Sequence, residues 1–276
     1  MTGTAESAAR ATRWVSARGI SLEVRGAGDP VLLLHGIGGS AAACGALAEV
    51  LSTRGYRTYC WDAPGYGESA DPVPNAAGSP GSYDHALVVA ELIAELDGGP
   101  IHLIGTSWGG VIATAVATAN PASVRSLVLA DSTRGSGVNR ERAQGMRARI
   151  GELREAGAPA FAATRAGRLV SPGCAAEIAR AVESDMARVR LSGYTAAAEY
   201  MARTDTGPSL ATLAAPTLVL VGVDDVVTGV DESRLLADAI PGARFGLILG
   251  AGHAALQEKP ADVGAHILRF WKELDE

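Results

Sequence analysis

Cysteine is scarce in this sequence, which has three in 276 residues: Cys44, Cys60 and Cys174. The number is odd and no two of them form a C-x-x-C pair, so neither a disulfide framework nor a zinc ribbon is expected. So little cysteine suits a reducing compartment, and we expect a cytoplasmic protein.

Long apolar runs and blocks of like charge are also missing. No stretch approaches 18 consecutive apolar residues, and the first 13 residues lack the apolar core of a secretory signal. The formal net charge is −6, and a surface of that sign repels the phosphate backbone of a nucleic acid. We therefore expect neither a membrane span nor a nucleic-acid partner.

The composition that remains is that of a folded chain, because 47% of the residues are hydrophobic, which excludes wholesale disorder. Short unbroken apolar runs alternate with helical patterns, as in a parallel sheet with helices on both faces. Strands are predicted at 31–34, 56–61, 101–104, 126–130, 217–221 and 245–249, helices at 41–51, 85–96, 107–119, 232–239 and 261–274, and a loop at 71–81.

The alternation stops after Asp131 and returns near residue 210. Residues 135–209 are rich in Ala, Arg, Glu and Leu, contain no convincing buried strand and are divided by prolines into helical stretches. We therefore predict a helical insertion at 135–209 within one α/β core formed by residues 1–134 and 210–276.

A candidate nucleophile lies between a predicted strand and a predicted helix. Residues 105–109 are Gly-Thr-Ser-Trp-Gly, a G-x-S-x-G pattern in the context of a nucleophile elbow. The tight turn leaves no room for neighbouring Cβ atoms, and the free N–H groups at the helix start favour developing negative charge. A chance match in an Ala- and Gly-rich chain is the alternative, and the context favours Ser107 as a nucleophile.

A serine hydroxyl needs a base, and five histidines are available: His35, His85, His102, His253 and His266. His102 falls within a predicted strand, and His85 and His266 fall on predicted helices. His253 follows the last strand, at the sheet edge where the sites of such folds gather. We therefore predict His253 as the base.

The acid that orients the base has more than one candidate. Asp224 and Asp225 follow the strand at 217–221, and Asp131 ends the strand at 126–130. Both strand ends should open on the same edge of the sheet, and either acid keeps the chain order serine, acid, histidine. The residues alone leave this choice open.

A glycine-rich turn after the first long strand completes the set. Residues 35–39 are His-Gly-Ile-Gly-Gly, and glycine there allows a backbone N–H to turn towards the serine. We predict that the N–H groups of Ile37 and Trp108 hold an oxyanion.

Together these motifs resemble the α/β-hydrolase superfamily from about Gly19 to Leu274. The resemblance rests on L-H-G-I-G-G-S at 34–40, W-D-A-P-G-Y-G-E-S at 61–69, G-T-S-W-G-G at 105–110, V-G-V-D-D at 221–225 and G-A-G-H at 250–253. It implies the α/β-hydrolase fold, a Ser–His–Asp triad, no cofactor and a helical cap over the site, and we expect no metal. The acid of this family usually lies three residues after the glycine of its G-x-x-D turn, so the resemblance places it at Asp225.

Within the superfamily, the short cap and the acid turn look like the enol-lactonase and small-esterase branch. The oxyanion loop differs from that of typical 3-oxoadipate enol-lactonases, and it lacks the proline found in C–C bond hydrolases and prolyl iminopeptidases. We expect a serine hydrolase that cleaves a small carboxylic ester or lactone through an acyl-enzyme on Ser107. The alternatives are a C–C bond hydrolase of ring-cleavage (vinylogous diketone) products and a ligand-binding relative without turnover.

Specificity is expected to lie in the insertion and beside the nucleophile. Large apolar or amphipathic residues there are candidates for substrate contact: Trp108, Met146, Phe161, Tyr194 and Met201. Because aromatic residues make up only 5% of the chain, a tryptophan directly after the nucleophile suggests an apolar pocket wall. Helical methionines and aromatics are more often plain core, and the sequence gives no indication of an oligomeric state.

Overall fold

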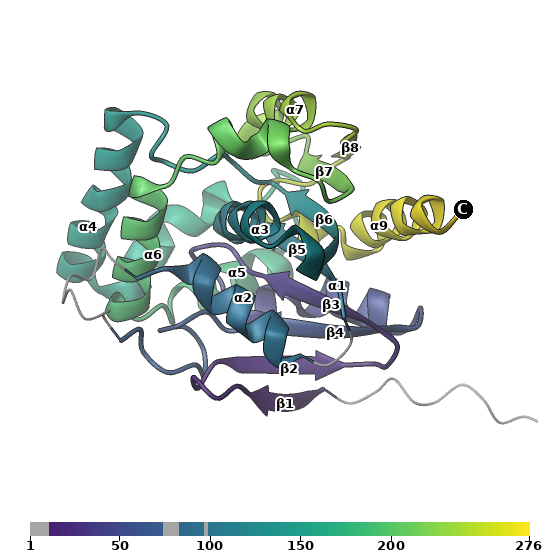
Figure 1. The fold of residues 1–276 in the computed structure, drawn as a ribbon. Helices are drawn as coiled ribbons and strands as arrows, with labels where there is room; N and C mark the ends of the chain where they lie inside the picture. The colour runs from purple at the N-terminus through teal and green to yellow at the C-terminus, as the bar shows by residue number, and fades with distance from the viewer. Residues whose placement is uncertain (1–10, 74–82, 97–98) are drawn as a thin grey trace, which may run out of the picture.

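The computed structural model describes residues 11–73, 83–96 and 99–276, and its strands form one eight-stranded sheet in the order β1-β2-β4-β3-β5-β6-β7-β8 (Figure 1). Strand β2 pairs antiparallel with β1 and β4, and the remaining pairs are parallel. The strands are β1 (Thr12–Val15), β2 (Ser21–Arg25), β3 (Asp29–Leu34), β4 (Tyr56–Trp61), β5 (Ile101–Thr106), β6 (Val124–Ala130), β7 (Thr217–Gly222) and β8 (Arg244–Ile248).

The two antiparallel strands at one edge were not predicted from the sequence. Strand β1 is mostly exposed, and β2 carries the charged residues Glu23 and Arg25, so neither forms an unbroken apolar run. Their pairing comes from tertiary contact, with Leu22 of β2 opposite Trp61 of β4. The sheet therefore has two strands before the first strand that the sequence predicted.

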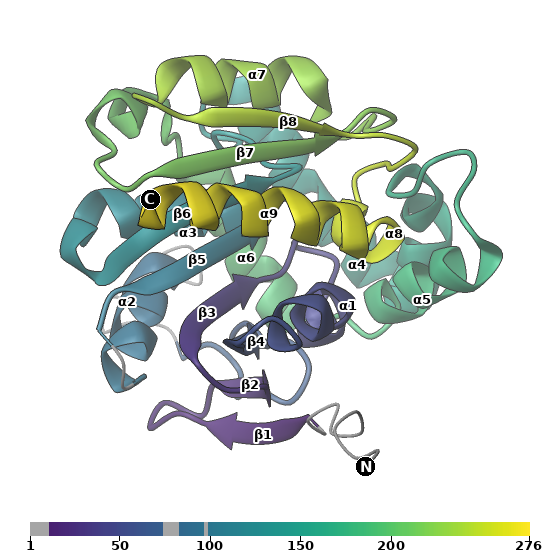
Figure 2. The ribbon, with the colours of Figure 1, turned by 90° about the vertical axis from the view of Figure 1, so that its right-hand side faces the viewer.

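Helices cover both faces of the sheet (Figure 2). Helices α1 (Ala41–Ser52), α8 (Ala255–Glu258) and α9 (Pro260–Asp275) lie on one face, and α2 (His85–Glu95), α3 (Trp108–Ala119) and α7 (Gly229–Ala239) on the other. Along β3, Val31 and Leu33 join the apolar cluster of the first face, and Leu32 and Leu34 join that of the second. This double burial explains the continuous apolar run and confirms the predicted α/β fold class.

The chain between β6 and β7 is helical, as predicted. Residues 131–216, all of which the structure describes, contain α4 (Arg140–Arg165), α5 (Ala176–Met186) and α6 (Leu191–Arg203) but no strand. Helices α4 and α6 pack against each other at one end of the sheet (Figure 1). Of the prolines expected to divide the insertion, Pro159 lies inside α4, and the break in this helix occurs at Gly157, whose backbone leaves the helical region. We keep the division into a core and a cap at 135–209 as a proposal.

The other predicted elements are present with small changes at their ends, and α8 was not expected. Of the loop predicted at 71–81, residues 71–73 have no regular structure and residues 74–81 lie outside the described residues. Among the described helices, none is both long and apolar enough to cross a membrane.

Candidate active site

Ser107 occupies a sharp turn between β5 and α3. Its backbone has φ 54° and ψ −117°, in the positive-φ region that non-glycine residues rarely adopt. The Ser107 N–H donates to the carbonyl of Ala130 at the end of β6, which anchors the strained turn to the sheet. The serine therefore lies at the start of α3, as the nucleophile elbow requires.

The positions around Ser107 require glycine because a side chain at any of them would collide with neighbouring atoms. A Cβ built on Gly105 would lie 2.4 Å from the Gly109 carbonyl oxygen, and one on Gly109 would lie 2.2 Å from the Leu34 carbonyl oxygen. A Cβ on Gly110 would lie 2.1 Å from the hydroxyl of Ser132. The strand, turn and helix could not approach this closely with any other residue at these positions.

His253 and Asp225 lie in the loops that follow β8 and β7, and their side chains are in contact. Nδ1 of His253 lies 3.0 Å from Oδ2 of Asp225, and both side chains are buried. The carboxylate also accepts hydrogen bonds from the N–H groups of Val227 at 2.7 Å and Thr228 at 3.2 Å, and from the Thr228 hydroxyl at 2.6 Å. Because a carboxylate can only accept, the proton of His253 lies on Nδ1 and Nε2 is left to act as a base.

The contact between the two groups also sets their charge. Burial lowers the pKa of His253, but the hydrogen bond and the charge of Asp225 outweigh it, so the pKa lies above the ordinary value for histidine. Burial alone would raise the pKa of Asp225. The hydrogen bonds from His253 and Thr228 outweigh burial and hold the pKa of Asp225 well below its ordinary value. Asp225 is therefore ionised throughout the pH range in which the ring of His253 is neutral.

Asp131, the rival acid, makes no such contact. It is fully buried at the end of β6, and its Oδ1 accepts a hydrogen bond from the Gly222 N–H at 2.8 Å. Among the described residues, Oδ2 of Asp131 has no hydrogen-bond partner. Burial raises the pKa of Asp131 to about 8, so it is mostly protonated at neutral pH. Asp224 is half-buried, and the geometry favours Asp225 as the acid.

The glycine-rich loop after β3 lies against the serine. A Cβ on Gly36 would lie 3.4 Å from the Cβ of Ser107, so the loop backbone reaches the serine turn. The ring of His35 holds this loop: Nε2 accepts from the Ala63 N–H at 3.1 Å, which leaves Nδ1 to donate to the Gly36 carbonyl at 2.7 Å. Burial lowers the pKa of His35, in keeping with a neutral ring in this structural role.

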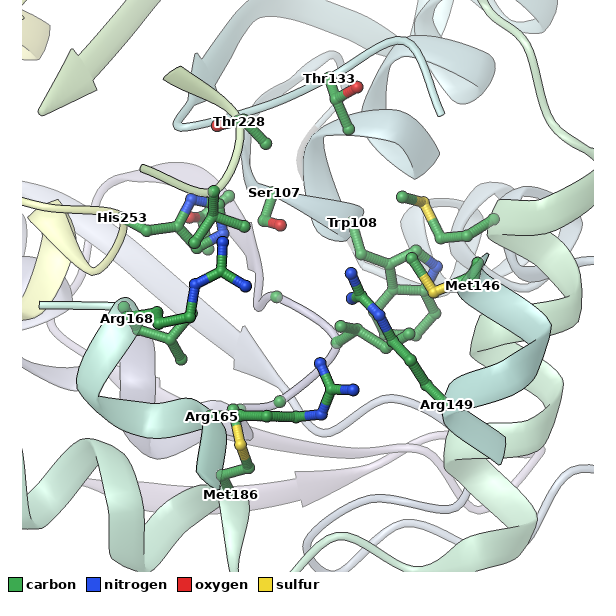
Figure 3. A pocket seen from close by; sticks show the side chains of 18 of the residues that line it. Ser107, Trp108, Thr133, Met146, Arg149, Arg165, Arg168, Met186, Thr228 and His253 are labelled. Atoms are coloured by element: carbon green, nitrogen blue, oxygen red, sulfur yellow. The ribbon is translucent and has the colours of Figure 1, made fainter. Parts of the chain in front are cut away.

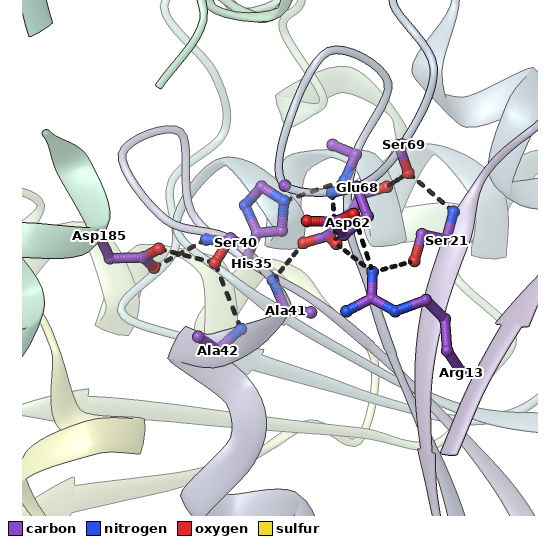
Figure 4. Close-up of polar contacts among 12 residues, drawn as sticks. Arg13, Ser21, His35, Ser40, Ala41, Ala42, Asp62, Glu68, Ser69 and Asp185 are labelled. Carbon is purple, nitrogen blue, oxygen red and sulfur yellow. Dashed lines mark hydrogen bonds and ion pairs between the residues drawn. The ribbon is translucent and has the colours of Figure 1, made fainter. Parts of the chain in front are cut away.

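Two buried carboxylates fix the start of α1 beyond the loop (Figure 4). Asp62 accepts from the N–H groups of Ala41 at 2.9 Å and Glu68 at 3.0 Å, so it orders the turn after β4. Asp185 of α5 accepts from the Ser40 N–H at 2.9 Å and its hydroxyl at 2.7 Å. The helical insertion is therefore bonded directly to the segment beside the glycine-rich loop.

Ser107 and His253 line one cavity of about 620 Å³, a size typical of small-molecule sites. Figure 3 shows the two side chains at the same end of it. Its wall also contains Ile37 and the residues named above as candidates for substrate contact: Trp108, Met146, Phe161, Tyr194 and Met201. That these five touch a substrate stays a prediction.

Sequence reasoning missed the basic character of this cavity. Four arginines of the insertion line it: Arg142, Arg149, Arg165 and Arg168. Figure 3 shows the guanidinium groups of Arg149, Arg165 and Arg168 turned into the cavity. Arg142, Met146 and Arg149 are spaced i, i+4 and i+7, which places them on one face of α4, and this spacing was the available signal.

This chain is similar to known enzymes in both sequence and structure. The 2-hydroxy-6-oxononadienedioate/2-hydroxy-6-oxononatrienedioate hydrolase of Cupriavidus pinatubonensis is 31% identical over 84% of this chain and 83% of its own length. The 3-oxoadipate enol-lactonase 2 of Acinetobacter baylyi is 29% identical over 74% of each chain. The solved structure of a thermophilic esterase from Thermogutta terrifontis superposes with a TM-score of 0.82 and 28% identity, covering 96% of this chain and 99% of the esterase.

The family model described as the alpha/beta hydrolase fold matches residues 29–260. The match spans the strand before the glycine-rich loop, the serine turn, the helical insertion and the loop that carries His253. The chain belongs to the α/β-hydrolase fold family.

Proposed function

We propose that this protein is a serine hydrolase that cleaves a carboxylic ester or lactone of a small molecule. One observation carries the proposal: the strained Ser107 and His253 line the same cavity, and His253 is already oriented by the buried carboxylate of Asp225. Nucleophile, base and orienting acid then act as one unit.

In the proposed acylation step, Nε2 of His253 takes the proton of the Ser107 hydroxyl as its oxygen attacks the carbonyl carbon. The N–H groups of Ile37 and Trp108 hold the negative charge that develops on the carbonyl oxygen. Asp225 stabilises the imidazolium, which then protonates the leaving alcohol or the ring oxygen of a lactone.

Water resolves the acyl-enzyme by the same chemistry in reverse order. His253 removes a proton from the water, the resulting hydroxide attacks the acyl carbon, and the proton is returned to the Ser107 oxygen as the ester bond breaks. The carboxylic acid product then leaves through the cavity. The helices at 135–209 act in this proposal as the cap that shapes the cavity.

The printed names of an esterase and an enol-lactonase among the relatives support the ester or lactone class. The 31% identity with the 2-hydroxy-6-oxononadienedioate/2-hydroxy-6-oxononatrienedioate hydrolase favours a second candidate, hydrolysis of a C–C bond in a ring-cleavage product with the same three residues. Both candidates use Ser107, so only the products separate them.

The test is a substrate screen across p-nitrophenyl esters, lactones and vinylogous diketones, with Ser107→Ala as the control. We expect ester or lactone turnover in the wild type and a loss of several orders of magnitude in the variant. Turnover of the diketones alone would favour the second candidate. Ester hydrolysis that survives in Ser107→Ala would contradict the mechanism, and no turnover of any class would favour a ligand-binding protein.

A further inference from the structure

The helical insertion gives the cavity a charge opposite to that of the protein. The whole chain carries a formal net charge of −6, yet the insertion side of the cavity presents arginines. They come from separate places: Arg149 from within α4, Arg165 from its last turn, and Arg168 from the 3₁₀ turn that follows. A basic wall inside an acidic protein concentrates positive potential at one place.

Some of these charges are neutralised by neighbouring carboxylates. Arg142 lies 3.5 Å from Glu232, which Arg134 already holds at 3.0 Å. Arg165 forms an ion pair with Glu152, and its guanidinium lies over the ring of Phe161. These arginines are parts of the framework of the wall.

Arg149 and Arg168 are different. Within the part of the chain that the structure describes, neither forms an ion pair with a carboxylate. Asp185 of the cavity wall is engaged by Ser40 and by Arg188 at 3.1 Å. Glu141 is exposed in the first turn of α4, two helical turns away from Arg149.

Both of these guanidinium groups point towards the cavity in which Ser107 lies (Figure 3). The positive charge of Arg149 is felt at His253, where it opposes the rise in pKa caused by Asp225. The wall also contains apolar side chains of the insertion, among them Met146 and Met186. The cavity thus has a reactive end, an apolar wall and a cationic side.

We propose that Arg149 and Arg168 form an anion subsite that binds a free carboxylate of the substrate. The substrate class is then an ester or lactone that carries a second, ionised carboxyl group. Two planar guanidinium forks match a carboxylate in shape and charge. The position of the cleaved bond rests on the proposed function at Ser107, whereas the binding of the carboxylate does not.

The kinetic test compares substrates that differ only in charge. We would measure p-nitrophenol release from the p-nitrophenyl monoesters of glutaric, adipic and suberic acid, and from the same compounds with the free carboxylate masked as a methyl ester. The rate without enzyme is subtracted. The wild type should prefer the free acid at one or more chain lengths by about tenfold or more in kcat/KM, the order expected for a charge-assisted contact. Equal values at every length would overturn the subsite without the need for any variant.

Variants assign the effect to the two arginines. Arg149→Gln and Arg168→Gln should each lower kcat/KM for the preferred free acid by about tenfold and change it less than threefold for the methyl ester. Arg154→Gln, an exposed position of α4 outside the cavity wall, is the matched control and should change neither. An equal loss on both substrates would contradict an anion subsite.

Binding of adipate alone, measured by calorimetry, separates this proposal from the proposed function. Adipate binding that weakens in Arg149→Gln and Arg168→Gln supports the subsite even if no ester is hydrolysed, and in that case only the proposed function fails. Ester hydrolysis without adipate binding or a preference for the free acid overturns the subsite and leaves the proposed function standing. Inorganic phosphate that binds more tightly than adipate would contradict the assignment to a carboxylate.

Discussion

Nδ1 of His253 donates to Oδ2 of Asp225 across 3.0 Å, and the Asp225 side chain is completely shielded from solvent. The carboxylate is held in turn by the N–H groups of Val227 and Thr228, so it has no freedom to turn away. Asp131 lies nearby, but its buried carboxyl group is held by Gly222 instead. Two acids at one sheet edge therefore have distinct environments, and that difference can be measured.

Replacing the two acids separately should give opposite results. Asp225→Asn removes the charge that orients and stabilises the imidazolium, and kcat should fall about 10³- to 10⁴-fold. Asp131→Asn replaces a carboxyl group that is mostly protonated at pH 7 by a neutral group of the same shape, and kcat should change less than about threefold. Steady-state kinetics at pH 7 distinguishes them, and a larger loss in Asp131→Asn would reverse the assignment of the acid.

The pH dependence of kcat/KM should report the titration of His253. The base must be neutral, and its pKa is raised above 6.5 by Asp225 despite burial, so activity should be lost on the acid side through an apparent pKa above 6.5. In Asp225→Asn the two largest causes that raise the pKa are lost, while burial and the charge of Arg149 still lower it, so the acid limb of the residual activity should lie at a lower pH than in the wild type. An acid limb that is identical in both proteins would mean that a different group is titrating.

Asp131 should make the fold less stable as pH rises. Its pKa is about 8 in the folded protein and near 3.8 in the unfolded chain, so between these values the unfolded state binds fewer protons. The contribution of the Asp131 carboxyl group to the free energy of unfolding is fully present below about pH 4. It is lost as the pH rises towards 8, at up to about 1.4 kcal/mol per pH unit. In urea unfolding, the free energy of unfolding of Asp131→Asn should therefore increase relative to that of the wild type between pH 5 and 8. A constant difference across this range would contradict the buried, protonated carboxyl group.

Adding one methyl group at the serine turn should be far more damaging than in the insertion. The Cβ of Gly109→Ala would meet the Leu34 carbonyl oxygen at 2.2 Å, so unfolding free energy should fall by about 3 kcal/mol or more and activity should be lost. Gly151 lies in α4, where the added Cβ would meet no atom within 4 Å outside its own stretch of helix, and Gly151→Ala should be neutral or stabilise by up to about 1 kcal/mol. Chemical denaturation of both variants checks the pair, and comparable stabilities would contradict the geometry of the turn.

The core of the fold and the candidate triad could be predicted because their constraints are local. Strands buried on both faces, such as β3, appear as continuous apolar runs, and the serine turn needs its glycines at fixed positions. The edge strands β1 and β2 could not be predicted in the same way, because β1 is mostly exposed, β2 is interrupted by the charged residues Glu23 and Arg25, and β2 is placed by its pairing with β4.

The basic wall could not be predicted from local patterns. For the acid, the residues alone left Asp131 and Asp225 open, the family resemblance favoured Asp225, and the contact of Asp225 with His253 agrees with that choice. Arg165 and Arg168 reach the cavity because α4 is kinked at Gly157 and ends in a 3₁₀ turn, and helical spacing does not place residues across such a break.

The most direct test of the account is to react the protein with a fluorophosphonate probe and locate the adduct by peptide mass spectrometry. An activated serine attacks such a phosphorus centre, whereas an ordinary hydroxyl does not. The account predicts one adduct, on Ser107, that is lost in Ser107→Ala and greatly slowed in His253→Ala. No labelling of Ser107, or labelling that persists without His253, would contradict the central claim that these residues form a hydrolytic site.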